Sequence, residues 1–292
     1  MNMKTRQLLS FSLVFLLTSC FETHPYDVRV DGERDINNAQ METIEKRFAG
    51  ELTKPLRVAF ISDTHLWLAD AKDQVEDINR RIGNGEVDFV AHLGDLTDTA
   101  TEKEFEWSRE ILQGLKCPWV ALIGNHDFLG TGDQVYETMY GVMDFSFIAG
   151  RVKFVCLNTN ATEYDYMAAV PNFDYMEEQF TEGTDKFDRT IVLMHAAPYS
   201  DQFNNNVCKA FRRYLDFAPG LMCCVYGHDH QNYWSKIYDD LIMEQTGHGD
   251  DLWFYGIDCA KHRNYCIITI YPYDPSSDTN AKDSYEIENI TY

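Results

Sequence analysis

Four short motifs and one further histidine combine carboxylate, amide and imidazole side chains that could bind metal ions. They are Asp63-Thr64-His65, Gly94-Asp95-Leu96-Thr97-Asp98, Gly124-Asn125-His126-Asp127, His195, and Gly227-His228-Asp229-His230. Each follows directly on an apolar run. Oxygen and imidazole donors without a thiolate suit Mn, Fe, Zn, Ni or Mg rather than copper(I). One such motif is close to chance, and a buried histidine is more often a core residue than a ligand, but the ordered set is too regular for that reading.

Alternating strands and helices would bring these residues together. Apolar runs at 56–61, 87–93, 119–123, 191–194 and 222–226 predict five buried strands, each ending at one of the motifs. Helices are predicted at 70–82 and 101–115, the second with Thr101 and Glu104 in capping-box spacing. Strands that alternate with helices are typical of βαβ units. Since ligands of α/β sheets bind beyond the carboxyl ends of the strands, we expect one shared crevice.

The rest of the chain indicates further strands and a mixed sheet arrangement. Residues 145–149 and 152–157 predict a hairpin around Gly150-Arg151, and a helix is expected after Pro171. The tail contains three or four β runs, including 252–257 and 265–271. The expected fold is therefore α/β, with two mixed β-sheets packed together and helices outside, a four-layer αββα sandwich.

The N-terminus has the pattern of a processing signal. Basic residues at Lys4 and Arg6 precede an apolar run over 8–17, which is too short to span a membrane, and then Leu17-Thr18-Ser19-Cys20. The last four residues resemble the bacterial lipobox, which implies a lipid on Cys20 and an exported protein anchored in the bacterial cell envelope, on a face that the sequence leaves open. The alternative is an ordinary signal peptide with a chance cysteine nearby.

Charge and cysteine content limit the possible partners. The chain has 25 Lys and Arg against 47 Asp and Glu, a net charge of −22, which becomes −24 without residues 1–19. Nucleic acid is therefore an unlikely partner, because backbone binding needs basic residues. Seven of the eight cysteines remain besides Cys20, an odd number that argues against a fully paired disulfide framework. Oligomeric state is left open.

The order of the motifs resembles the calcineurin-like metallophosphoesterase superfamily over roughly residues 55–232. The resemblance implies two divalent metal ions. Asp63, His65 and His230 would hold the first, Asn125, His195 and His228 the second, and Asp95 would bridge both. His126 would be the general acid, and Asp98 would accept a hydrogen bond from it and orient it. The alternative for Asp98 is a helix cap or a solvated loop residue.

The implied reaction is hydrolysis of a phosphodiester or phosphomonoester by hydroxide that the two metals activate. Two branches of the family are disfavoured. Thr99-Ala100 stands where protein phosphatases have an arginine, and Leu96-Thr97-Asp98 contains no tyrosine such as purple acid phosphatases use as a ligand. We expect a small substrate. The alternatives are a sugar-nucleotide-type pyrophosphatase or a nuclease on the same scaffold, and, less favoured, a non-catalytic lipid-anchored metal-binding protein.

The expected organisation is a signal peptide over 1–19, a leader over 20–53 with a short helix at 37–48, and one metallophosphoesterase domain over 54–292. Several residues near the motifs receive weaker predictions. Trp67, Phe128 and Tyr199 either pack the loops, which is favoured, or contact substrate. His92 is expected to be a core histidine, and His248 has a small chance of approaching the substrate.

Overall fold

The computed structural model describes residues 28–236, 252–273 and 283–292. The predicted signal peptide, Cys20 and His248 lie outside these described residues. Within them, no helix combines the length and the apolar character needed to cross a membrane.

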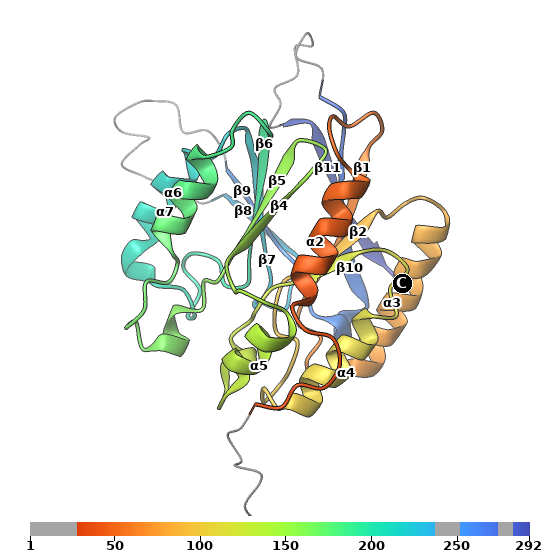
Figure 1. Cartoon of the computed structure of the whole chain (residues 1–292), viewed down its shortest axis with the longest axis vertical. Coiled ribbons are helices and arrows are strands. Elements are labelled where there is room, and N and C mark those ends of the chain that lie inside the picture. The colour runs from red at the N-terminus through yellow and green to blue at the C-terminus, as the bar shows by residue number, and fades with distance from the viewer. Residues whose placement is uncertain (1–27, 237–251, 274–282) are drawn as a thin grey trace, which may run out of the picture.

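Two β-sheets form the centre of the molecule (Figure 1). The first has the order β11-β10-β1-β2-β3, formed by β1 (Leu56–Ile61), β2 (Phe89–His92), β3 (Trp119–Ala121), β10 (Asn264–Ile270) and β11 (Tyr285–Thr291). Strands β1, β2 and β3 are parallel, and β10 is antiparallel to both β1 and β11. The carboxyl ends of β1, β2 and β3 therefore meet at one edge.

The second sheet has the order β4-β5-β6-β7-β9-β8. Its strands are β4 (Phe145–Ala149), β5 (Val152–Leu157), β6 (Arg189–Met194), β7 (Leu221–Tyr226), β8 (Tyr233–Lys236) and β9 (Trp253–Gly256). The four central strands are parallel, and the two edge strands β4 and β8 are antiparallel to their neighbours. Both sheets are thus mixed, as predicted.

Apolar side chains fill the space between the sheets. Phe89 of β2 packs edge-on against Phe147 and Phe154 of the second sheet, with ring centroids 5.8 and 5.4 Å apart. All three side chains are fully buried. Burial of one such side chain contributes about 1.5–3 kcal/mol to folding stability. These apolar contacts therefore hold the two sheets against each other.

Helices cover the outer faces (Figure 1). On the first sheet lie α3 (Leu68–Gly83), α4 (Glu102–Leu112) and α5 (Gly132–Met139), and on the second α6 (Phe173–Thr181) and α7 (Cys208–Leu215). Thr101 and Glu104 form the predicted capping box of α4. Four layers in the order helix, sheet, sheet, helix confirm the predicted fold class.

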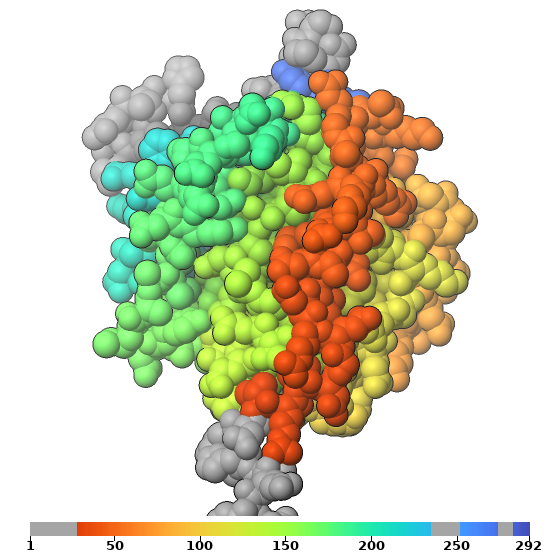
Figure 2. All heavy atoms as spheres, viewed as in Figure 1, coloured from red at the N-terminus to blue at the C-terminus, as the bar shows by residue number. Residues whose placement is uncertain are grey.

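The helix predicted in the leader is α2 (Ile36–Arg47). It contacts β3 of one sheet and β4 of the other, and Ile44 is fully buried among core residues of the sandwich. Figure 2 shows the red and orange segment from residue 28 running over the surface between the green side, which carries the six-stranded sheet, and the yellow and orange side of α3 and α4. This helix therefore covers the edge at which the two sheets meet.

Candidate active site

The predicted motifs follow the carboxyl ends of β1, β2, β3, β6 and β7, and the loops that carry them are hydrogen-bonded to each other. The amide of Asp63 donates to Gly94 O at 3.1 Å, and that of Gly227 donates to His195 O at 3.0 Å. The first bond joins two loops of one sheet, and the second joins two loops of the other. Seven predicted ligand residues are brought to one place in this way.

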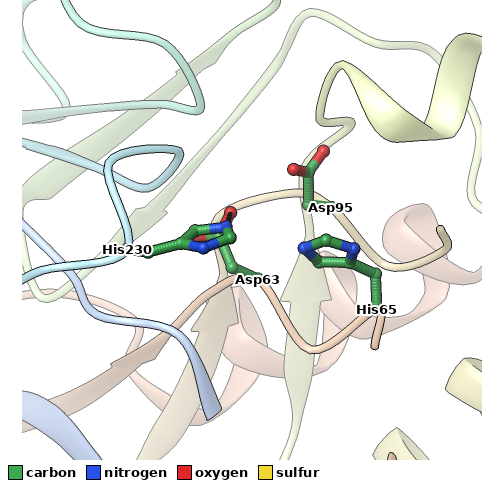
Figure 3. Close-up of side chains that lie close together, drawn as sticks. All are labelled: Asp63, His65, Asp95 and His230. Carbon is green, nitrogen blue, oxygen red and sulfur yellow. Dashed lines mark ion pairs between the residues drawn. The ribbon is translucent and has the colours of Figure 1, made fainter. Parts of the chain in front are cut away.

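The first cluster contains Asp63, His65, Asp95 and His230, whose donor atoms all lie within 4.8 Å of one another. Figure 3 shows their side chains lying close together on three separate loops. Nε2 of His230 lies 3.2 Å from Oδ1 of Asp63. Within the described part of the chain, Asp63 Oδ1 and His65 Nε2 are buried, and neither makes a well-aligned hydrogen bond, so the ion-pair contact with His230 is the one that Asp63 Oδ1 has. Buried polar atoms of this kind are costly unless a ligand satisfies them.

The second cluster contains Asp95, Asn125, His195 and His228. Oδ1 of Asn125 lies 3.1 Å from His195 Nε2 and 3.0 Å from His228 Nδ1. Oδ1 of Asp95 lies 3.3 Å from the same nitrogen of His195. Asp95 therefore belongs to both clusters, which is the position expected of a bridging ligand. The arrangement agrees with the predicted pairing of ligands, whose roles stay predictions.

Acceptors outside the clusters fix which nitrogen of each histidine faces inward. His195 Nδ1 lies 2.8 Å from the main-chain carbonyl of Leu93. A carbonyl only accepts, so Nδ1 carries a proton, and Nε2 is the nitrogen that could give its lone pair to a metal ion when one is bound. Nδ1 of His65 faces the carboxylate of Asp98 at 3.4 Å, which leaves the unpartnered Nε2 for the first cluster. Such outer partners are usual around metal-binding histidines.

Four of the predicted ligands have a left-handed backbone. The φ angles are 51° at Asp63, 56° at Asp95, 68° at His228 and 51° at His230. This region is unfavourable for residues with a Cβ and persists only where the surroundings enforce it. The hydrogen-bonded loops described above supply that enforcement at the clusters.

Two glycines allow these loops to approach closely. A Cβ on Gly124 would overlap the amide nitrogen and Oδ1 of Asp95, and one on Gly227 would overlap Oγ of Ser62 and crowd Oδ2 of Asp63. Any larger residue would displace a predicted ligand. The glycines therefore matter for packing around the carboxylates more than for backbone freedom.

Asp127 was part of a predicted motif but received no role from the sequence. Its buried carboxylate accepts hydrogen bonds from the amides of Leu96, Thr97 and Gly124 at 3.2, 2.9 and 2.9 Å. It thereby connects the loop after β2 to the loop after β3. Burial and the nearby Asp95 raise the pKa of this carboxyl to about 7. The sequence gives only one indication of this loop-connecting role, which is that Asp127 directly follows Asn125 and His126 in the same motif.

His126 lies beside the first cluster, but the predicted contact with Asp98 needs a correction. Nδ1 of His126 is 3.0 Å from the main-chain carbonyl of Asp98 and 3.6 Å from its carboxylate. The hydrogen bond that orients the ring is therefore made by the backbone, because the carboxylate is drawn toward His65. The side chain of His126 is 37% exposed, so a substrate could reach it.

Charge interactions differ among the buried histidines. Burial alone would lower the pKa of His195, but the adjacent Asp95 carboxylate raises it above its usual value. Burial lowers the pKa of His65. His92, which is fully buried and bonded to Thr64 Oγ1, has its pKa lowered to about 3 by burial and is a neutral core residue, as predicted.

The donor set fits two divalent cations. It combines two buried carboxylates, one amide oxygen and four imidazoles whose donor atoms face one another, and the buried His65 Nε2 makes no hydrogen bond within the described residues. Hard oxygen and borderline nitrogen donors suit Mn, Fe, Zn, Ni or Mg. Asp63, His65, Asp95 and His230 would hold one ion, and Asp95, Asn125, His195 and His228 the other.

The aromatic residues near the clusters mostly pack the loops. Trp67 is half-buried, with its ring 5.4 Å from those of both His65 and His230. Phe128 packs edge-on against Tyr164 at 5.2 Å. Tyr199 differs, since it is 62% exposed at the end of the loop after β6.

Comparison with known proteins agrees with this geometry. The family model described as calcineurin-like phosphoesterase matches residues 56–232. A 3',5'-cyclic-nucleotide phosphodiesterase from Nostoc sp. is 24% identical over 198 residues, which cover 61% of this chain and 73% of that protein.

Two solved structures share the fold. A dimetal phosphatase from Danio rerio has a TM-score of 0.56 at 13% identity, over 76% of this chain and 94% of its own. A purple acid phosphatase from yellow lupin seeds has a TM-score of 0.52 at 14% identity, over 83% of this chain and 55% of its own. The chain therefore belongs to the calcineurin-like phosphoesterase family and is a phosphoric ester hydrolase.

Proposed function

We propose that this protein hydrolyses a small phosphodiester or phosphomonoester at a site that holds two divalent metal ions. The observation that carries the proposal is the position of Asp95, which faces Asp63, His65 and His230 on one side and His195 and His228 on the other. A carboxylate shared by two donor clusters is what a two-metal site requires. When bound, such ions supply positive charge to the phosphoryl oxygens and lower the pKa of water.

The protein's own residues have separate tasks in this reaction. The seven donors of the two clusters would hold the two ions, which when bound would supply the positive charge that orients the phosphoryl group. His126 is the proton donor for the leaving oxygen. Because the carbonyl of Asp98 accepts a hydrogen bond from Nδ1, the ring presents Nε2 to the substrate side, and the proton for the leaving oxygen would come from Nε2.

Charge and the named relative support a small phosphodiester. The net charge of −22 repels long polyanions outside the immediate site. The Nostoc sp. relative is named for cyclic nucleotides, which are small phosphodiesters. A sugar-nucleotide-type pyrophosphatase and a nuclease remain the alternatives on this scaffold, and a non-catalytic metal-binding protein is disfavoured by the complete donor set.

A substrate panel tests the proposal. Purified protein is stripped with chelator and assayed with Mn²⁺, Fe²⁺, Zn²⁺, Ni²⁺ or Mg²⁺ against a bis-aryl phosphodiester, an aryl monoester, a cyclic nucleotide, a sugar-nucleotide pyrophosphate and long DNA. We expect metal-dependent turnover of the diester or monoester well above that of DNA. Fewer than two metals per chain after reconstitution, or no metal-dependent turnover of any ester, would refute the proposal.

We further propose that the mature protein is exported and anchored by a lipid on Cys20. The supporting features are the apolar run over 8–17 and the Leu17-Thr18-Ser19-Cys20 sequence. Expression of wild type and Cys20→Ala in a bacterium, followed by detergent phase partition, tests this. The wild type should enter the detergent phase and the variant the aqueous phase. Identical partition of the two would contradict the lipid anchor.

A further inference from the structure

Asp201 contacts a residue of the second cluster, although it belongs to none of the motifs. Its Oδ1 lies 2.7 Å from Nε2 of His228. Nδ1, on the other side of the same ring, lies 3.0 Å from Asn125 Oδ1. The carboxylate can only accept, so Nε2 carries a proton, and Nδ1 is the nitrogen that could give its lone pair to a metal ion when one is bound.

The loop that carries Asp201 is held in place independently of His228. The next residue, Gln202, accepts hydrogen bonds through its carbonyl from the amides of Ala161 and Thr162 at 2.9 and 3.3 Å. On the other side, the amide of Ser200 donates to Ala197 O at 3.1 Å. The Asp201 carboxylate is therefore presented to His228 from a fixed main chain, although its side chain is 82% exposed.

His228 depends on a carboxylate partner for its ring orientation more than His195 does. His195 is fully buried and its outer nitrogen is held by the Leu93 carbonyl. The side chain of His228 is 16% exposed, and its backbone has a φ of 68°. The amide of His228 is fixed by Asp63 Oδ2 at 3.1 Å, and the inner side of the ring contacts Asn125 Oδ1 at 3.0 Å. The contact with Asp201 restrains the ring itself.

We propose that Asp201 is a positioning residue that orients His228 as a ligand of the second metal ion. A carboxylate behind a metal-binding histidine fixes the tautomer and strengthens the bond to the metal, and its loss typically costs 10–100-fold in affinity. This inference rests on the two-metal proposal above. It adds a residue from outside the family's motifs and assigns it to one metal ion only.

Isothermal titration calorimetry of the metal-free protein with Mn²⁺ tests the inference. We expect two binding steps in the wild type. In Asp201→Asn one step should weaken by about 10–100-fold while the other changes by less than about threefold. The weakened step should be the one that is lost in His228→Ala. The melting temperature of metal-free Asp201→Asn should equal that of the wild type, since an exposed side chain contributes little to folding.

Asp229→Asn is the matched control. Asp229 is an exposed acid directly beside His228, so its substitution makes the same change in net charge. Among the described residues, the Asp229 carboxylate makes no contact with His228 or His230. We expect both Mn²⁺ binding steps of Asp229→Asn to have the same affinity as in the wild type.

The outcomes separate the two proposals. Fewer than two Mn²⁺ per wild-type chain would refute the two-metal site itself. Two ions in the wild type with an unchanged Asp201→Asn titration would overturn only the role of Asp201. Equal weakening of both steps, or the same loss in Asp229→Asn, would also overturn it, because a general charge effect would then explain the result.

Discussion

The carboxylate of Asp127 accepts two hydrogen bonds from Thr97, one from its amide at 2.9 Å and one from its hydroxyl at 2.8 Å. Thr97 belongs to the loop that carries Asp95, and Asp127 to the loop that carries Asn125. The bridging residue and a residue of the second cluster are therefore positioned by one buried contact. Neither Asp127 nor Thr97 faces the clusters as a metal donor.

Asp127→Asn should destabilise the fold and weaken both metal sites. The amide of Asn has only one oxygen, so at least one of the amide donors now paired with Asp127 would lose its acceptor. A buried unsatisfied donor costs about 1–3 kcal/mol, and we expect a loss of about 2–4 kcal/mol in the free energy of unfolding. Urea denaturation of metal-free protein measures it, with exposed Asp229→Asn as the control. An unchanged midpoint would show that the contact does not hold the loops together.

Gly124→Ala should abolish metal binding at both clusters. The added methyl group would overlap the backbone and carboxylate of Asp95, so the bridging residue would have to move. Metal content per chain after reconstitution is the measurement. Gly83→Ala is the control, because a Cβ there meets no atom within 4 Å and Gly83 ends α3. That variant should retain both metals and gain up to about 1 kcal/mol. Full metal content in Gly124→Ala would refute the expected clash.

The meeting of the motifs in one crevice could be predicted from the sequence largely because of one geometric rule, whereas the role of each residue came from the family resemblance. Parallel strands place their carboxyl ends at one edge, so residues that follow the apolar runs at Ile61, Leu93 and Ile123 had to meet. The capping box at Thr101 was predicted for a similarly local reason, since its spacing alone defines it. Predictions of this kind depend on contacts between residues close in the chain or on a repeated pattern.

Features that depend on distant contacts could not be predicted. Asp201 lies in a loop six residues beyond His195 but faces His228, and nothing in either segment indicates the pairing. The position of β9 between β7 and β8 likewise follows from packing across the sheet. The atom of Asp98 that holds His126 was misassigned, because a main-chain carbonyl has no signature in a sequence.

Substitutions of His126 and Asp98 should have different effects on turnover and metal binding. His126→Ala should retain both metals and lose about 10²–10⁴-fold in kcat on substrates with poor leaving groups. Asp98→Asn keeps the main-chain carbonyl that orients His126, so its loss in kcat should be smaller. It removes the carboxylate that faces His65, so binding of the first metal should weaken. Turnover of an aryl ester with a good leaving group is the internal control, because it needs little proton donation. Equal losses on both substrates in His126→Ala would refute the acid role.

Asp144 should make the metal-free protein less stable at neutral pH than at pH 4. Burial raises the pKa of this carboxyl to about 6, and only the hydrogen bond from the Asn158 amide, at 2.8 Å, opposes the rise. A folded pKa above the unfolded value means that the folded state binds the proton more tightly. Ionisation of Asp144 therefore lowers the free energy of unfolding as pH rises from about 4 to above 6.

Asp144→Asn keeps an oxygen for Asn158 and removes the charge. It should gain about 1–3 kcal/mol at pH 7.5 and almost nothing at pH 4. Urea unfolding at both values measures the gain. Glu177→Gln, an exposed carboxylate on α6, is the control for net charge. A gain in Asp144→Asn that is equal at the two pH values, or matched by Glu177→Gln, would show that burial of Asp144 is not its cause.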